Sequence, residues 1–172
     1  MGHQDISVLD GGLPEWIRNG FQTKIKTPKT YGTGNFKANF QVKYIKSYHD
    51  ILDNLNKKLF TIVDARSKGR FRGNTQEPRK HLKSGHIQDS INIPYSEVLN
   101  KGKFKSKSEL KILFTKKYPN KKPLVFSCGS GLTACIVMLA NSIVFNENQV
   151  IYDGSWTEWA ELQNLKIRPI SP

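Results

Sequence analysis

The most informative pattern in this sequence is Leu124-Val125-Phe126-Ser127-Cys128-Gly129-Ser130-Gly131-Leu132-Thr133-Ala134. An apolar run typical of a buried strand leads into a short glycine-rich turn, and a helical pattern follows over 134–144. This order directs several backbone N–H groups, and the positive end of a helix dipole, at one point. A cysteine there loses its proton more easily than a free one, so Cys128 is predicted to be a nucleophile. A buried structural cysteine is the alternative.

Strand and helix patterns alternate on both sides of this segment. Apolar or alternating runs predict short strands at 40–45, 59–63, 91–93 and 150–152. Ser47, and Ser106 with Glu109, are typical caps of two helices between them, and a last helix is expected around Trp159. The alternation predicts an α/β fold with a mostly parallel central sheet. Ligands of such sheets bind at the carboxyl ends of strands, where Asp64-Ala65-Arg66 and Cys128 both fall.

Composition narrows the classes of partner. The 172 residues carry a formal net charge of +13, and nine lysines lie between Lys101 and Lys122. A solvated helix face explains the lysine cluster, and no aromatic residues alternate with it as a nucleic-acid surface requires. No apolar stretch is long enough to span a bilayer, so neither a nucleic acid nor a membrane is an expected partner. Small anionic substrates suit the positive charge.

The two cysteines also limit the chemistry. Cys128 and Cys135 lack the spacing of a zinc site, so we expect no metal and no cofactor. A disulfide between them is poorly motivated, which favours a reducing compartment such as the cytoplasm or the mitochondrion. Cys135 is followed by apolar residues that suggest simple packing in a helix, and a redox role is the less favoured alternative.

An internal similarity links the two ends of the chain. Asp10-Gly11 and Glu15-Trp16 match Asp153-Gly154 and Glu158-Trp159 at one fixed offset. This pattern predicts that residues 1–20 are the end of a preceding homologous domain, with coincidence as the alternative. Residues 21–39, rich in Thr, Lys, Gly, Pro and Asn, are predicted to form a linker, and residues 40–172 the domain itself.

Three separated motifs together resemble the rhodanese superfamily. They are Asp64-Ala65-Arg66-Ser67-Lys68-Gly69-Arg70-Phe71, then Gly85-His86-Ile87-Gln88-Asp89-Ser90-Ile91-Asn92-Ile93-Pro94, then the Cys128 segment. Asp153-Gly154-Ser155-Trp156 is similar to the closing motif of that superfamily. The resemblance implies a rhodanese-like fold with helices on both faces of the sheet, and places His86 in a motif that is structural more often than catalytic.

The residues after the cysteine distinguish subtypes of the superfamily. Thiosulfate sulfurtransferases typically carry two basic residues where this chain has Gly129 and Ser130, and Cys-Gly-Ser-Gly resembles the 3-mercaptopyruvate sulfurtransferase pattern. The resemblance implies that Arg66 and Arg79 bind the carboxylate and keto group of the donor, a task that suits the planar guanidinium.

The resemblance also implies roles for the residues of the turn. Cys128 would take sulfur from 3-mercaptopyruvate as a persulfide, release pyruvate, and pass the sulfur to a thiol acceptor such as thioredoxin or a small dithiol. The backbone from Gly129 through Gly131 and Leu132 to Thr133 would stabilise the anionic sulfur, and Ser130 would relay a proton. In this family a His and an Asp of a first domain support Ser130, so we expect slow turnover by this chain alone.

Three other functions compete with this interpretation. A cysteine phosphatase needs arginine at the sixth position after its cysteine, where this chain has Ala134. Thiosulfate sulfurtransferase activity stays open because donor preference in the superfamily is broad. A non-catalytic rhodanese module that binds a partner is the third alternative, against which the presence of Cys128 argues.

Overall fold

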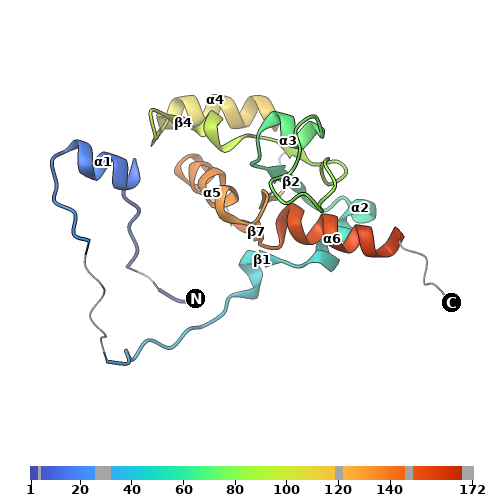
Figure 1. Cartoon of the computed structure of the whole chain (residues 1–172), viewed down its shortest axis with the longest axis horizontal. Coiled ribbons are helices and arrows are strands. Elements are labelled where there is room, and N and C mark those ends of the chain that lie inside the picture. Colours follow the sequence, from blue (N-terminus) through green and yellow to red (C-terminus); the bar gives the residue numbers. More distant parts are fainter. Residues whose placement is uncertain (4, 26–31, 119–121, 146–148, 168–172) are drawn as a thin grey trace.

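A parallel five-stranded sheet forms the centre of the molecule in the computed structural model (Figure 1). The structure describes all residues except 4, 26–31, 119–121, 146–148 and 168–172, and for 164–167 only the backbone. The strands lie in the order β1 (Ile45–Lys46), β7 (Val150–Tyr152), β6 (Leu124–Ser127), β2 (Thr61–Asp64) and β3 (Ile91–Asn92). Each neighbouring pair is parallel, which confirms the predicted α/β class.

Helices cover both faces of this sheet. Alternate residues of β2 and β6 point to opposite faces, as the period of a strand requires. Val63 and Phe126 pack in one core with α4 (Lys107–Lys117) and α5 (Leu132–Val144). Ile62 and Val125 pack in a second core with α2 (Tyr48–Lys57) and α6 (Ser155–Ile167). β2 and β6 are therefore buried on both sides, which explains their nearly continuous apolar sequences.

The predicted helix caps are present. Ser47 accepts a hydrogen bond from the Asp50 N–H at the start of α2, and Asp50 accepts one from the Ser47 N–H at 2.8 Å. Ser106 and Glu109 repeat this capping box at the start of α4. The hydrogen bonds from the serine backbone and side chain lower the pKa of both carboxyl groups below their ordinary values.

The structure differs from the sequence prediction at the first strand and at one hairpin. Within the predicted strand 40–45, Val42–Tyr44 form a 3₁₀ helix and only Ile45 joins β1. Phe40 and Val42 are exposed, so their alternation has no buried face to pair with. The prediction missed the hairpin of β4 (Leu99–Asn100) and β5 (Lys103–Phe104), whose strands are too short to show a period. A 3₁₀ turn (Tyr95–Val98) precedes it.

The N-terminal segment lies beside this hairpin, outside the sheet layers (Figure 1). Its helix α1 (Gly12–Arg18) buries no residue. Two polar contacts join the segment to the hairpin: the Phe104 N–H donates to Asp10 Oδ1 at 2.9 Å, and Lys103 pairs with Glu15. The two Asp-Gly turns share one hydrogen bond, since the Glu15 N–H donates to the Gly11 carbonyl as the Glu158 N–H donates to that of Gly154. Their backbones differ, because Gly11 has a φ of +87° and Gly154 has no positive φ.

Candidate active site

The two strand ends singled out in the sequence are neighbours in the sheet. Cys128 directly follows β6, and Asp64, which ends β2, is in register with Ser127. The Ala65 N–H extends this pairing by donating to the Ser127 carbonyl at 2.8 Å. The carboxyl edge of the sheet therefore brings the cysteine turn and the segment after β2 together, as expected for an α/β fold.

The turn after Cys128 is held by the first residue of α6. Ser155 Oγ accepts hydrogen bonds from the N–H groups of Cys128 and Gly131, both at 3.1 Å, and donates to the Tyr152 carbonyl at 2.9 Å. Ser155 is fully buried, so no water competes for these bonds. The sequence motifs include Ser155 in the closing motif but predict no role for it. Its place directly after the Asp153-Gly154 turn is the local signal that could have indicated one.

Gly131 closes the turn toward α6 in the left-handed region of backbone conformation. Its φ is +85°, and a Cβ atom there would lie 2.8 Å from Asp153 Oδ1. Both observations require glycine. The Gly131 N–H points to Ser155, so the expectation that this group stabilises an anionic sulfur is corrected: Gly131 shapes the turn and lies outside the residues that line the cavity.

Five other N–H groups of this segment donate to no protein acceptor among the described residues. They belong to Gly129, Ser130, Leu132, Thr133 and Ala134. The first turn of any helix leaves such groups free, and α5 adds the positive end of its dipole. The segment therefore offers an anion both hydrogen bonds and positive potential beside Cys128.

Cys128 itself is only 2 % exposed and lines a cavity of about 360 Å³. The residues around this cavity are Arg70, Pro78, Arg79, Cys128, Gly129, Ser130, Leu132 and Thr133. The lining contains two arginines and no acidic side chain. A small anion fits both the size and the charge of this space.

The structure corrects the role expected of Arg66. Its side chain is 1 % exposed and lies away from the cavity, stacked 4.7 Å from the Trp156 ring. Arg66 donates to both oxygens of Asp64, to Glu77 Oε1 at 2.9 Å and to the Gly85 carbonyl at 2.8 Å. Since these bonds use its donors and bury its charge between two carboxylates, Arg66 is a structural residue that joins the loop after β2 to the sheet.

Arg70, and not Arg66, is the arginine of this motif that lines the cavity beside Cys128. It lies on the short helix α3 (Lys68–Arg72), and its Nη2 would be 2.8 Å from a Cβ atom at Gly129. Glu77 fixes the guanidinium by accepting from Nε at 3.1 Å and from Nη2 at 2.6 Å. Sequence reasoning missed Arg70 because two arginines within one motif cannot be told apart without knowing which one turns inward.

Arg79 lines the same cavity but has a different kind of partner from Arg70. Its side chain is exposed, and Nη1 donates to Thr157 Oγ1 at 2.5 Å. Thr157 in turn donates to the Gly129 carbonyl at 2.6 Å. Arg79 is therefore linked to the cysteine turn through a hydroxyl, whereas a carboxylate fixes Arg70.

Ser130 lies at the rim of the cavity and is exposed. Its hydroxyl has no hydrogen-bond partner in the part of the chain that the structure describes. No histidine lines the cavity. His86 Nδ1–H donates to the Phe71 carbonyl at 2.8 Å, and the His86 ring stacks on the Phe71 ring, in line with the structural role expected for it. His81 pairs with Glu161 at the surface.

Cys135 faces away from this cavity. Its thiol lies 3.4 Å from the Gly131 carbonyl and lines an apolar pocket between α5 and the N-terminal residues 8–12. Burial, together with the nearby Cys128 and Asp153, raises the pKa of the Cys135 thiol above its ordinary value. Cys135 and Cys128 are both free thiols.

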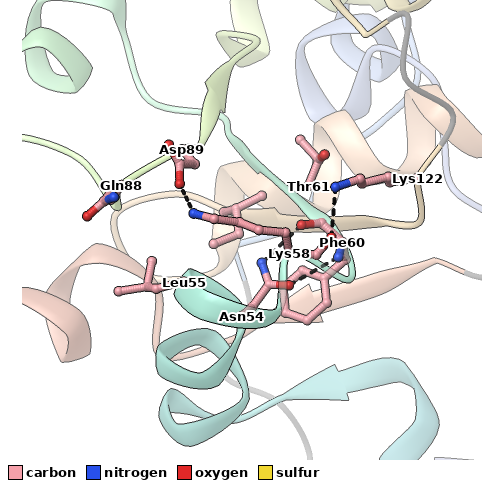
Figure 2. A pocket seen from close by; sticks show the side chains of 9 residues that line it. Asn54, Leu55, Lys58, Phe60, Thr61, Gln88, Asp89 and Lys122 are labelled. Carbon is pink, nitrogen blue, oxygen red and sulfur yellow. Dashed lines mark hydrogen bonds and ion pairs between the residues drawn. The ribbon is translucent and has the colours of Figure 1, made fainter.

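A second cavity, of about 180 Å³, lies at the opposite edge of the sheet (Figure 2). Figure 2 shows Lys58 paired with Asp89, and Lys122 Nζ donating to the Lys58 carbonyl at 2.8 Å. Asn54 closes the turn beside them by accepting from the Leu59 and Phe60 N–H groups. The polar groups of this second cavity are already paired with one another, and no cysteine lines it. The cavity beside Cys128 is therefore the candidate active site.

Comparison with known proteins agrees with this geometry. The profile of the rhodanese-like domain matches residues 47–162, so the chain belongs to the rhodanese-like domain family. It is 44 % identical over 161 residues to 3-mercaptopyruvate sulfurtransferase of Mus musculus, with 92 % of this chain and 54 % of the relative covered. Identity to thiosulfate sulfurtransferase of the same species is 39 %, with the same coverage.

A solved structure is similar as well. The chain superposes on SseA from Escherichia coli, described as a 3-mercaptopyruvate sulfotransferase with the rhodanese fold, with a TM-score of 0.75 and 31 % identity. The alignment covers 89 % of this chain and 57 % of SseA. The chain spans about half the length of the curated relatives it matches. No helix among the described residues is long and apolar enough to cross a membrane, and those residues contain no cluster of potential metal ligands.

Proposed function

We propose that this protein is a sulfurtransferase that moves sulfur from 3-mercaptopyruvate to a thiol acceptor through a persulfide on Cys128. The observation that carries the proposal is the cavity in which Cys128 meets free N–H groups and two arginines. The similarity to 3-mercaptopyruvate and thiosulfate sulfurtransferases supports the reaction class.

The first step forms the persulfide. The Cys128 thiolate attacks the sulfur of 3-mercaptopyruvate, an S–S bond forms, and the C–S bond breaks with its electron pair left on the enolate of pyruvate. The enolate then takes a proton, for which the exposed Ser130 hydroxyl at the rim is the proposed relay. The free N–H groups from Gly129 to Thr133 stabilise negative charge on sulfur in this step, with Gly131 excepted.

Arg70 and Arg79 are the proposed donors to the carboxylate and keto oxygens of the substrate. Both line the cavity, and a guanidinium binds a carboxylate through two parallel hydrogen bonds. In the second step an acceptor thiolate, from thioredoxin or a small dithiol, attacks the outer sulfur and releases the Cys128 thiolate. A reducing compartment, the cytoplasm or the mitochondrion, suits a reaction that depends on a free thiol.

Thiosulfate is the second candidate donor, because it is a compact dianion and the cavity is positively charged. The uncharged pair Gly129 and Ser130 favours the organic donor. We further propose that residues 1–20 are the end of a preceding rhodanese-like domain, on the basis of the Asp-Gly and Glu-Trp pairs that recur at one fixed offset in the sequence.

The test measures pyruvate released from 3-mercaptopyruvate with dithiothreitol as the acceptor, beside sulfite released from thiosulfate. The proposal expects pyruvate release that Cys128→Ser abolishes, at a rate higher than sulfite release. Faster sulfite release would favour thiosulfate as the donor, and release of neither product would favour a partner-binding module.

A further inference from the structure

Thr157 connects Arg79 to the turn that contains Cys128. Its hydroxyl accepts a hydrogen bond from Arg79 Nη1 at 2.5 Å and donates one to the Gly129 carbonyl at 2.6 Å. A hydroxyl has one proton and two lone pairs, so both bonds form at the same time. The Thr157 N–H also donates to the Gly129 carbonyl, at 3.1 Å.

The first turn of α6 supports the cysteine turn at three successive residues. Ser155 accepts from two of its N–H groups, the Trp156 N–H donates to the Cys128 carbonyl at 3.0 Å, and Thr157 binds the Gly129 carbonyl. Only the Thr157 hydroxyl also contacts an arginine of the cavity. Its backbone N–H already holds the carbonyl, so the hydroxyl is the group available for a second task.

Arg79 needs such a partner more than Arg70 does. Glu77 accepts two hydrogen bonds from Arg70, whereas no carboxylate among the described residues pairs with Arg79. A free arginine side chain loses rotamer entropy when a ligand orders it. A partner that orders it in advance removes part of this cost from binding.

We propose that Thr157 is a positioning residue that orients Arg79 for the carboxylate of the sulfur donor. The inference rests on the proposed function for the nature of the donor. It assigns to α6 a part in substrate binding, in addition to its support of the turn.

The test compares Thr157→Val, which keeps the shape and the backbone bond but loses the hydroxyl, with Thr157→Ser, which keeps the hydroxyl. Thr115→Val, on the exposed face of α4, is the matched control. The rate of persulfide formation on Cys128 is followed by intact mass against 3-mercaptopyruvate concentration. We expect Thr157→Val to raise the half-saturating concentration about tenfold, the effect of one hydrogen bond to a charged group. The maximal rate should change by less than about twofold, since the turn keeps its backbone bonds.

Thr157→Ser and Thr115→Val should behave like the unchanged protein. An unchanged half-saturating concentration in Thr157→Val would overturn the inference, as would a fall in the maximal rate alone or a failure of Thr157→Ser to restore binding. In an Arg79→Ala background Thr157→Val should have no further effect, because the group that it positions is absent. A further loss of binding there would also overturn the inference.

A second measurement does not depend on turnover. Pyruvate, which carries the same carboxylate and keto group, should protect Cys128 from alkylation by iodoacetamide, and Thr157→Val should raise the protecting concentration about tenfold. If the unchanged protein forms no persulfide but shows this shift, the proposed function fails and the inference stands. Absence of protection in the unchanged protein would overturn the inference. If Thr157→Val does not fold, Arg79→Ala, at an exposed position, takes its place in this test. Arg79→Ala should raise the pyruvate concentration needed for protection by about tenfold or more, and an unchanged concentration would overturn the inference.

Discussion

The Glu77 carboxylate accepts two hydrogen bonds from the Arg70 guanidinium, Nε to Oε1 at 3.1 Å and Nη2 to Oε2 at 2.6 Å. The same carboxylate accepts from the buried Arg66. Glu77 therefore joins an arginine of the core to an arginine of the cavity. Arg66 is buried in the fold, and Arg70 lines the cavity beside Cys128.

This difference predicts separate consequences for the two arginines. Arg66→Ala leaves Asp64 and Glu77 without their buried partner, so we expect the free energy of unfolding to fall by about 3–5 kcal/mol. Arg70→Ala leaves Glu77 paired with Arg66, so its unfolding free energy should fall by only about 1 kcal/mol. Arg70→Ala should instead raise the 3-mercaptopyruvate concentration for half-maximal persulfide formation about tenfold or more.

Denaturant unfolding and the persulfide assay check both variants. A stable Arg66→Ala protein with weak donor binding, beside an unstable Arg70→Ala protein, would contradict the assignment of the two roles.

Ser155 is predicted to control the order of the cysteine turn. Ser155→Ala removes the buried acceptor of two N–H groups, so we expect the free energy of unfolding to fall by about 1–3 kcal/mol. Cys128, which is now buried, should react faster with iodoacetamide because the turn loosens. Ser142→Ala, which loses an exposed hydrogen bond within α5, is the control and should change neither quantity. An unchanged alkylation rate in Ser155→Ala would show that the turn does not depend on it.

Gly131 and Gly102 form a matched pair for testing the close contact with Asp153. Their φ angles are +85° and +83°, but a Cβ atom at Gly102 would have no neighbour within 4 Å, and one at Gly131 would be 2.8 Å from Asp153 Oδ1. Alanine at either position costs about 1–2 kcal/mol of unfolding free energy for the backbone conformation. Gly131→Ala should cost more, because Asp153 must also move. Thermal or denaturant unfolding measures both variants. Equal losses of unfolding free energy in Gly131→Ala and Gly102→Ala would show that the close approach to Asp153 adds no cost.

The reactivity of Cys135 should follow its raised pKa. Because burial disfavours the thiolate, a smaller fraction of Cys135 is ionised at pH 8 than of an ordinary cysteine. Its alkylation at that pH should therefore be slower than that of a cysteine in a short peptide, and should increase with pH up to a higher midpoint. Mass spectrometry of Cys135 in Cys128→Ser follows this reaction alone. A midpoint at or below the peptide value would contradict the partial desolvation that raises the pKa of this exposed thiol.

Much of the fold could be predicted from local patterns. The capping boxes at Ser47 and Ser106 and the apolar runs of β6 and β7 are complete within a few residues. The Cys128 turn was predicted for the same reason. The 3₁₀ turn at Val42–Tyr44 was not, because burial by distant residues decides whether an alternating run becomes a strand.

The arginines of the site show where sequence reasoning fails. Arg66 and Arg70 are four residues apart in one motif, and their environments depend on Glu77 and Gly85, which lie farther along the chain. Thr157 and Ser155 act through hydrogen bonds to a segment about 28 residues earlier, and only the position of Ser155 directly after the Asp153-Gly154 turn is a local signal. Which side chain faces a cavity is a property of the packed fold.

The measurement that tests the account most directly is the intact mass of the protein after brief incubation with 3-mercaptopyruvate, and separately with thiosulfate, with no acceptor thiol present. We predict a gain of one sulfur atom from 3-mercaptopyruvate that is absent in Cys128→Ser and is reversed by dithiothreitol. A protein that gains no sulfur from either donor, or that gains it equally in Cys128→Ser, would contradict a persulfide on Cys128.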